Sequence, residues 1–382
     1  MNPDSVMFSN NPVEAVQAES ELVIFRSELQ DYNPSNNRFI RINLPVADKG
    51  WIDFSDTVLS LNLYNRSFQT DGANATKTAV KTRLGNLIKS ITVLNSQNEQ
   101  VEYINNYNVI NAVMDDYSYG TEHRASIENI LSGGSPTALP SDATEIAGQS
   151  TSTGQADGGN IVLCDKLMTG FTSGQFLLPL GYLVGGVCSI VIELEIPETA
   201  LTITGTGNDS NTKPAYRVAD VELRAKQIIF GDLFNQQFEA TLAEAGGVGI
   251  NYITETYLHN QNTIQSGVSS QQNLTYSVNP RSAKYMLCVH RNEADIEDAT
   301  KFSVENRCNA NINQYNWEIN GKMRPTQPID VNLNNISQSY ANVLDAFGQI
   351  GAINRNTMVS SSQDGTGYYR QASSSLASND GF

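Results

Sequence analysis

The stretch Ile190-Val191-Ile192-Glu193-Leu194-Glu195-Ile196 alternates aliphatic residues with residues of mixed polarity, and Pro197 follows it directly. Side chains of a β-strand point alternately to its two faces, so the four even-numbered residues would share one apolar face. Proline donates no hydrogen bond to a β-ladder and therefore ends such a strand. The stretch predicts a strand that is buried on one face and open to water on the other.

The same signal recurs along the chain as short β-branched or aromatic runs bounded by turn residues. In the first half we predict strands at 21–29, 38–46, 57–64, 87–94, 161–168, 176–180 and 187–196. In the second half we predict strands at 216–230, 250–258, 273–278, 284–290 and 312–319. Apolar residues at helical spacing predict helices at 105–116, 232–245 and 337–347. The set predicts an all-β fold of the sandwich or jelly-roll kind.

The two halves of the sequence repeat one order of elements. The first half has a strand, a turn at Asn95-Ser96 and a helix that contains residues 108–113. The second half has a strand, a turn at Asn320-Gly321 and a helix that contains residues 342–347. The two helical hexapeptides, NVINAV and NVLDAF, match at Asn, Val and Ala. We interpret the chain as a duplicated β domain.

Composition shifts along the chain predict its divisions. In chain order these are an arm with a short helix at 1–20, a first jelly roll at 21–203, a linker at 204–214 and a second jelly roll at 215–382. Residues 132–160 are rich in Gly, Ser, Thr and Ala, which predicts a long surface loop. The polar tail at 354–382 has no alternating strand, so we expect the second jelly roll to lack its last strands.

Length and charge exclude several classes of protein. The 382 residues fit two domains better than one core, and they carry a net charge of −16 with a pI near 4.6. A protein that coats nucleic acid needs clustered Lys and Arg, which this acidic chain lacks. Residues 1–20 have no secretory signal pattern. The uncharged span 167–192 is broken by Pro179 and several Gly, so we expect strands there rather than a transmembrane helix.

The sequence offers no assembled catalytic motif, and we predict that the protein is not an enzyme. A nucleophile elbow is absent, and Gly267-Val268-Ser269 is interpreted as a turn. Gly246-Gly247-Val248-Gly249 follows a predicted helix and is interpreted as its stop rather than as a phosphate loop. The three histidines, His123, His259 and His290, are scattered, and His290 is interpreted as structural. We therefore predict no catalytic and no cofactor-binding residue, and no cofactor.

Metal and phosphate sites are also not expected. The acidic cluster Glu293, Asp295, Glu297 and Asp298 lacks the alternate spacing of a calcium loop, so a solvated loop is favoured over a Ca²⁺ site. The cysteines have no zinc-ligand spacing, and we expect reduced thiols, with Cys164, Cys188 and Cys288 buried in apolar runs and Cys308 unassigned. A modest basic stretch is interpreted as a surface loop, with inner-face contact to nucleic acid or lipid headgroups as the lesser alternative. Its members are Lys77, Lys81, Arg83 and Lys89.

Several local patterns together resemble a known family. They are Leu87–Leu94 followed by Val101–Ile104 and a helix, Phe176–Leu180 leading to Ile192–Ile196, Tyr216 with Val221-Glu222-Leu223, and Asn320-Gly321 with Pro325 and Pro328. In the order and spacing of these patterns, the chain resembles the double jelly-roll major capsid proteins of tailless icosahedral viruses, the adenovirus-like lineage. The resemblance rests on pattern and not on invariant motifs.

The resemblance implies a fold of two tandem eight-stranded jelly-roll barrels, each with a short inserted helix. It implies a homotrimer that forms a pseudo-hexagonal capsomer of an icosahedral shell, with loop 132–160 as an outward decoration and arm 1–20 as a contact arm. The implied partners are neighbouring capsomers, penton or minor capsid proteins and, in some viruses, an internal membrane, without sequence-specific nucleic acid. The implied location is the virion, after synthesis in the host cytoplasm, and the expected source is a bacteriophage.

An alternative from another class stays open, namely a tandem β-sandwich module that binds carbohydrate or another surface. That alternative predicts an exposed aromatic platform and usually an export signal. The mass of the particle in solution would discriminate the two, because the capsid interpretation requires an oligomer.

Overall fold

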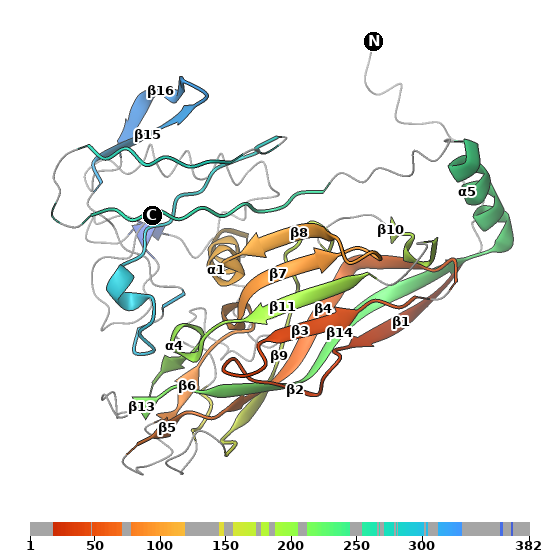
Figure 1. Ribbon diagram of the computed structural model, residues 1–382, viewed down its shortest axis with the longest axis horizontal. Helices are drawn as coiled ribbons and strands as arrows, with labels where there is room; N and C mark the ends of the chain where they lie inside the picture. The colour runs from red at the N-terminus through yellow and green to blue at the C-terminus, as the bar shows by residue number, and fades with distance from the viewer. Residues whose placement is uncertain are drawn as a thin grey trace.

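The computed structural model describes the chain (Figure 1) at residues 18–46, 48–70, 78–118, 145–148, 156–172, 177–182, 188–204, 212–244, 254–265, 267, 271–278, 280, 282–301, 303–304, 312–330, 360–361 and 368–369. The statements below concern these residues. Nearly all of the ordered core lies between residues 18 and 230.

The first sheet is built around two long neighbouring strands, β4 (Trp51–Asn65) and β14 (Tyr216–Phe230). Strand β1 (Ala18–Arg26) pairs with the outer side of β14, and β9 (Asn160–Asp165) pairs with β4. Short strands extend both flanks, with β2 (Asp31–Tyr32) on β14 and β10 (Leu177–Leu178) on the start of β4. Every pairing in this sheet is antiparallel.

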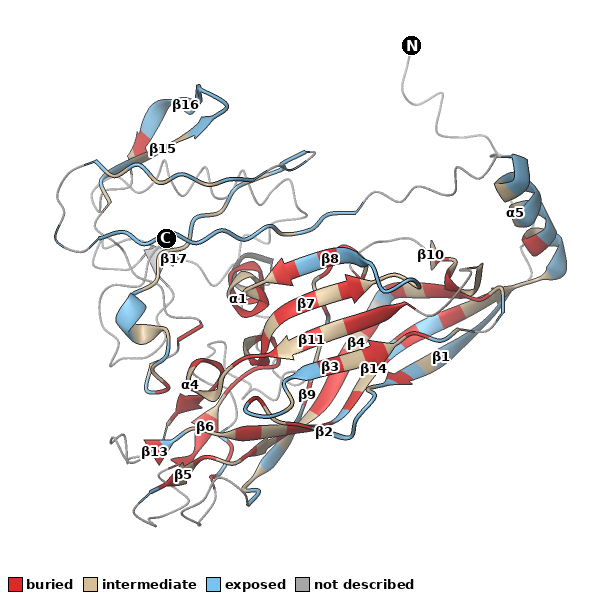
Figure 2. Ribbon diagram, viewed as in Figure 1, coloured by how far each residue is buried: buried red, intermediate tan, exposed pale blue. Residues whose placement is uncertain are grey.

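The second sheet has the order β3 (Phe39–Asn43), β11 (Ser189–Leu194), β7 (Ile88–Leu94) and β8 (Gln100–Asn105), again antiparallel. The buried apolar residues of both sheets belong to one hydrophobic cluster, and Figure 2 colours the buried segments of the strands red. Sheets ordered β1-β14-β4-β9 and β3-β11-β7-β8 have the strand order of an eight-stranded jelly roll. The stretch Ile190–Ile196 supplies β11, whose Ile190, Ile192 and Leu194 are buried as the alternation predicts.

Strand β14 corrects the predicted boundary between the two jelly rolls. We predicted that residue 215 opens the second barrel, whereas β14 lies between β1 and β4 and buries Val218, Val221 and Leu223 in the first core. The predicted linker 204–214 also contains β13 (Thr212–Lys213), which pairs with β5 (Phe68–Gln69). The first barrel therefore extends to Phe230, because the alternation of β14 fits the core that precedes it.

The predicted surface loop 132–160 is only partly described, and the described parts are not a free surface loop. Ile146 is 4% exposed, and its backbone pairs with Val80 of β6 (Val80–Lys81). Gly158 donates its N–H to the Asn65 carbonyl at 2.7 Å. Residues 145–148 and 156–159 thus pack on the barrel end, and the remainder of the loop lies outside the described residues. On its other side β6 pairs with β12 (Thr202–Ile203).

The predicted helices at 105–116 and 232–245 are confirmed as α1 (Tyr107–Ser118) and α5 (Asp232–Glu244). Short turns of helix add α4 (Pro197–Ala200), η3 (Gly85–Leu87), η6 (Leu180–Tyr182) and η7 (Glu293–Asp295). The helix predicted at 337–347 lies outside the described residues, as does most of the arm predicted at 1–20.

The second half gives a different outcome from the first. The strand predicted at 312–319 is confirmed as β15 (Gln314–Ile319), which forms a hairpin with β16 (Lys322–Asp330). Its turn is the predicted Asn320-Gly321, and both residues have positive φ, as a tight hairpin turn requires. The described residues of the strands predicted at 250–258, 273–278 and 284–290 show no β-pairing.

A second eight-stranded barrel is therefore not seen in the described part of the second half. The reason is visible in the side chains, since Leu258, Val278 and Met286 are 40–58% exposed and no second sheet covers them. In the polar tail 354–382, the short strands β17 (Ser360–Ser361) and β18 (Tyr368–Tyr369) pair with each other.

Candidate functional site

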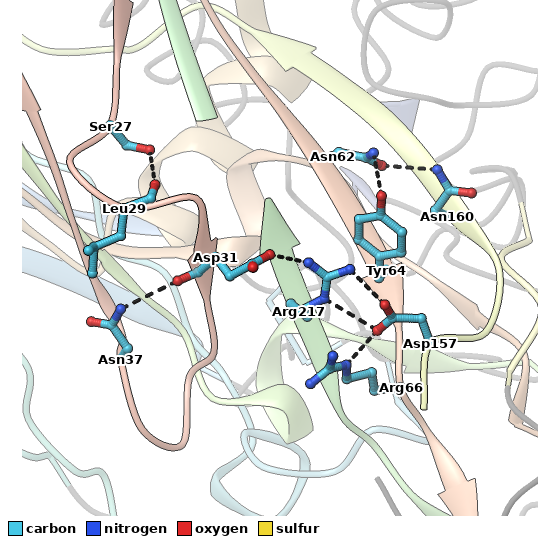
Figure 3. A network of polar contacts seen from close by, with 10 residues as sticks. All are labelled: Ser27, Leu29, Asp31, Asn37, Asn62, Tyr64, Arg66, Asp157, Asn160 and Arg217. Carbon is cyan, nitrogen blue, oxygen red and sulfur yellow. Dashed lines mark hydrogen bonds and ion pairs between the residues drawn. The ribbon is translucent and has the colours of Figure 1, made fainter. Parts of the chain in front are cut away.

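A cluster of charges joins the connections at one end of the barrel, and we call Asp31, Arg66, Asp157 and Arg217 the charge clasp (Figure 3). The Asp157 carboxylate accepts from Arg66 Nε at 2.6 Å and from Arg217 Nη2 at 2.6 Å. Arg217 also forms an ion pair with Asp31. One carboxylate thus holds two guanidinium groups, and one of these reaches a second carboxylate.

The charge clasp draws one residue from each of four segments that are distant in sequence. Asp31 lies in β2, between β1 and β3, and Arg66 directly follows β4. Asp157 precedes β9, and Arg217 lies at the start of β14. The Arg217 guanidinium also stacks over the Tyr64 ring, 4.0 Å from its centroid. Four segments that are distant in sequence are therefore fixed to one another at this end.

The electrostatics of the charge clasp favour its ionised form. Burial opposes ionisation of Asp157, but the hydrogen bonds from Arg217 and Arg66 outweigh it and lower the pKa of this carboxyl below its usual value. The hydrogen bond with Asp157 likewise raises the pKa of Arg217. The Asp157 side chain is 33% exposed, so solvent ions and protons can still reach it.

A neutral hydrogen-bond centre lies beneath the charge clasp. The Asn65 side chain is fully buried and donates to the carbonyls of Thr78 at 3.0 Å and Ile146 at 2.9 Å. Its Oδ1 atom accepts from the backbone N–H of Ser67. Asn65 thereby joins the end of β4 to the segment around Ile146 without any charge.

The opposite end of the barrel is held by aromatic rings, which we call the aromatic end. Trp51 at the start of β4 packs edge-on against Phe230, Phe234 and Phe238, with ring centroids 4.7–5.9 Å apart. Tyr182 completes the group and donates its hydroxyl hydrogen to Asn235 at 2.9 Å. These contacts fix α5 on the end of the first sheet.

The outer faces of both sheets carry exposed apolar side chains. On the first sheet Leu22 is 70%, Ile24 44% and Val162 55% exposed. On the second sheet Phe39 is 53%, Val101 63% and Tyr103 43% exposed. Among the described strands, β1 and β8 have no paired strand on their outer edges, whereas the outer edge of β3 meets Ser27 and Glu28, which follow β1. The barrel therefore presents apolar groups and unpaired strand edges on two sides.

The cysteines depart in part from the prediction of buried thiols. Cys188 is buried, Cys164 is half-buried, and Cys288 is exposed, while Cys308 lies outside the described residues. The sequence did not indicate that Cys288 Sγ lies 3.6 Å from Nε2 of His290. Although Cys288 is exposed to solvent in part, desolvation by the surrounding protein raises the pKa of its thiol and lowers the pKa of His290, which disfavours a thiolate–imidazolium pair. His290 also lies outside any paired strand.

The acidic and basic clusters are used locally. Asn292 caps η7 by accepting from the Ala294 N–H, and Asp298 accepts from the Thr300 N–H. No group of three or more His, Cys, Asp or Glu that could hold a metal occurs among the described residues. Within the basic stretch Arg83 is buried, and Lys89 forms an ion pair with Glu193 across the second sheet. Lys77 lies outside the described residues.

Among the helices in the described ranges, none is long and apolar enough to cross a membrane.

Comparison with known proteins gives matches only among solved structures. No known family model matches the sequence, and no curated protein sequence matches it significantly. The match with a chain of the quasi-atomic model of the PBCV-1 virus capsid covers 59% of this chain and 45% of that chain, at 10% identity and a TM-score of 0.39. The match with the Faustovirus major capsid protein covers 61% of this chain and 58% of that protein, at 11% identity and a TM-score of 0.36. The match with the mavirus major capsid protein covers 60% of this chain and 51% of that protein, at 8% identity and a TM-score of 0.30. The matches thus span about half the length of these capsid chains.

Proposed function

We propose that the chain is a structural subunit of a virus capsid and that its function is assembly rather than turnover. The observation that carries this proposal is the pair of apolar outer faces on a complete jelly roll. The capsid assignment itself follows the sequence resemblance given above. The described residues bring together no nucleophile, base and oxyanion donors in one place, and the charged groups of the charge clasp bind one another.

Exposed apolar groups on both sheets are what an assembly module requires. Single exposed apolar residues are ordinary on a protein surface, but rows on strands with unpaired edges are a liability for a lone monomer. Leu22 and Ile24 lie two residues apart on the same face of edge strand β1, and Val101 and Tyr103 do so on edge strand β8. Contact with neighbouring subunits would bury both rows and cover both edges.

The finer assembly follows from the same resemblance. We propose a homotrimer with pseudo-hexagonal outline that contacts neighbouring capsomers and penton or minor capsid proteins in the virion. An internal membrane beneath the shell and a bacteriophage source remain parts of this proposal. A net charge of −16 suits a shell protein that stays soluble and does not wrap the genome.

The alternative, a carbohydrate- or surface-binding module, is less well supported. It predicts an exposed aromatic platform, whereas Trp51 is buried against α5, and the exposed Phe39 and Tyr103 lie apart on β3 and β8, the two outer strands of the second sheet. A dependence of binding on glycan would nevertheless favour this alternative.

Light scattering coupled to size exclusion tests the proposal on the full chain. We expect a particle of three times the 41.7 kDa of one chain. Replacing Leu22→Lys or Tyr103→Lys should lower the mass, because a charge would enter the buried seam, whereas Thr241→Lys on an exposed turn of α5 should not. A stable wild-type monomer at micromolar concentration would contradict the proposal.

A further inference from the structure

The segment before β9 is fastened to the barrel by two layers of contacts. We call residues 145–148 and 156–159 the strap. In the inner layer, Gly158 donates to the Asn65 carbonyl at 2.7 Å, Gly159 donates to the Ala147 carbonyl at 2.8 Å, and Asn65 donates to the Gly159 carbonyl at 2.9 Å. In the outer layer, Asp157 joins the strap to Arg66 and Arg217.

The inner layer depends on close backbone approach. A Cβ atom at Gly158 would lie 2.7 Å from the Gly148 carbonyl carbon and 2.9 Å from the Asn65 oxygen. The two parts of the strap therefore lie against each other and against the end of β4. Such contacts form only while the strap is held in place, and each is a single hydrogen bond of modest net strength.

We propose that the charge clasp is a releasable catch, which holds the strap closed over the barrel end and opens when its carboxylates are neutralised or screened. The proposal stands apart from the capsid assignment. Asp157 is the only strap residue in the charge clasp, and it is the shared acceptor of both arginines. Loss of this one charge would break both ion pairs at once.

Among the described residues, charged groups reach Asp157 or its arginine partners from three places. Arg66 approaches from the end of β4, and Arg217 approaches from β14. Asp31 of β2 lies on the far side of Arg217, and the Tyr64 ring lies against the same guanidinium. Without the Asp157 charge, Arg66 and Arg217 would each lose this carboxylate, while Arg217 would keep its ion pair with Asp31.

Opening of the strap would uncover apolar groups. Ile146 is 4% exposed and Val80 is fully buried, and their backbones exchange hydrogen bonds of 2.8 and 3.0 Å. Release of the catch would leave neutral contacts to hold them, namely this backbone pairing and the hydrogen bonds of Asn65. We therefore expect graded loosening, in which the strap exchanges faster while the two sheets stay intact.

The direction of the pH effect follows from the sign of the Asp157 shift. The folded state lowers the pKa of this carboxyl, so its contribution is fully present above the ordinary carboxyl pKa of about 4 and is lost as the pH falls through the lower folded value. The catch is closed at neutral and mildly acidic pH. Salt weakens it at any pH, because the pairs are partly exposed.

Hydrogen–deuterium exchange of the full chain, corrected for intrinsic rates, tests the catch. We expect Asp157→Asn to speed exchange of the Ile146, Gly158 and Gly159 amides roughly tenfold at neutral pH, since loss of a charge-assisted pair removes about that factor. Acid at about pH 3 should speed the same amides in the wild type but add little in D157N. Exchange in β7 and β11 should not change, which would show that the fold is intact.

The matched control is Glu239→Gln, which removes the ion pair between Glu239 and Lys49 at the aromatic end. It should leave strap exchange at the wild-type rate. If D157N prevents folding, Arg66→Gln offers a second test, because it removes one of the two pairs and should speed the strap amides to a smaller degree. Equal strap exchange in wild type and D157N, or a wild-type strap indifferent to acid and salt, would overturn the proposal.

Discussion

The two ends of the barrel are closed by different chemistry. At one end, the four residues of the charge clasp join four segments of the chain through ion pairs. At the other end, Trp51 and its neighbours attach α5 through aromatic contacts. The strength of ion pairs depends on pH and salt, whereas the strength of ring packing depends mainly on shape and buried area. The same barrel therefore has one end that solution conditions can loosen and one that they cannot.

The largest effect is expected at the aromatic end. Trp51→Ala should destabilise the protein by about 3–5 kcal/mol, because it leaves a cavity beneath α5 and removes four ring contacts. Denaturant unfolding at low and high salt measures this, and the loss should be the same in both. The control is Trp317→Ala in β15, a half-buried tryptophan outside the barrel. Equal costs for the two variants would refute the role given to Trp51.

A smaller effect is expected from the neutral centre at the clasp end. Asn65→Ala leaves the buried carbonyls of Thr78 and Ile146 without their side-chain donor and should cost about 2–3 kcal/mol. Thermal unfolding measures the loss, which should not depend on salt. Asn62→Ala serves as the control, since that side chain is only partly buried on the same strand and donates to a tyrosine hydroxyl. A salt-dependent loss in Asn65→Ala would contradict the two-layer description.

The charge clasp should contribute less to the free energy of unfolding than Asn65 does, and its contribution should fall as the salt concentration rises. Arg217→Ala is expected to cost about 1–2 kcal/mol at low salt and clearly less at 1 M salt. Paired denaturation curves at the two salt concentrations give the difference. Arg26→Ala is the matched control, because Arg26 is a 78% exposed partner of Glu222 near the edge of the same sheet. If both arginines behave alike, the charge clasp is no more than surface pairing.

The smallest effect is expected from the one ion pair that we describe at the aromatic end. Lys49 and Glu239 form a 2.7 Å contact, yet both side chains are more than 40% exposed. Lys49→Ala should leave the melting temperature unchanged, because exposed pairs contribute little. Differential scanning calorimetry suffices, with Trp51→Ala in the same series for comparison. A marked drop would show that charge matters at both ends and would remove the contrast.

Alternation predicted the strands well because it reports which side chains face a core. It placed the strand at 216–230 correctly, since Val221 and Leu223 alternate with polar neighbours as a half-buried strand requires, and a register shift after Ala219 keeps Val218 buried as well. Alternation does not report which strand is the partner. The polar run before residue 215 therefore suggested a boundary, although β14 pairs with β1 and β4 in the first barrel.

The two ends were predictable to different degrees. The apolar side of α5, with Phe234 and Phe238, follows from helical spacing, but its partner Trp51 lies far away in sequence and carries no local signal. The charge clasp was not predicted at all. Its arginines and aspartates come from separate connections, and each alone has the pattern of an ordinary surface residue.

Strands β4 and β14 run from one end of the barrel to the other, and their pairing shifts register at two places. Each has 15 residues, and at roughly 3.3 Å per residue such a strand spans about 50 Å. They run antiparallel, with Trp51 and Phe230 at one end and Asn65 and Arg217 at the other. A pull along the barrel axis would therefore load their hydrogen bonds in shear, many at once, instead of opening them one by one. We therefore expect this pair of strands to resist stretching of the subunit along the barrel axis.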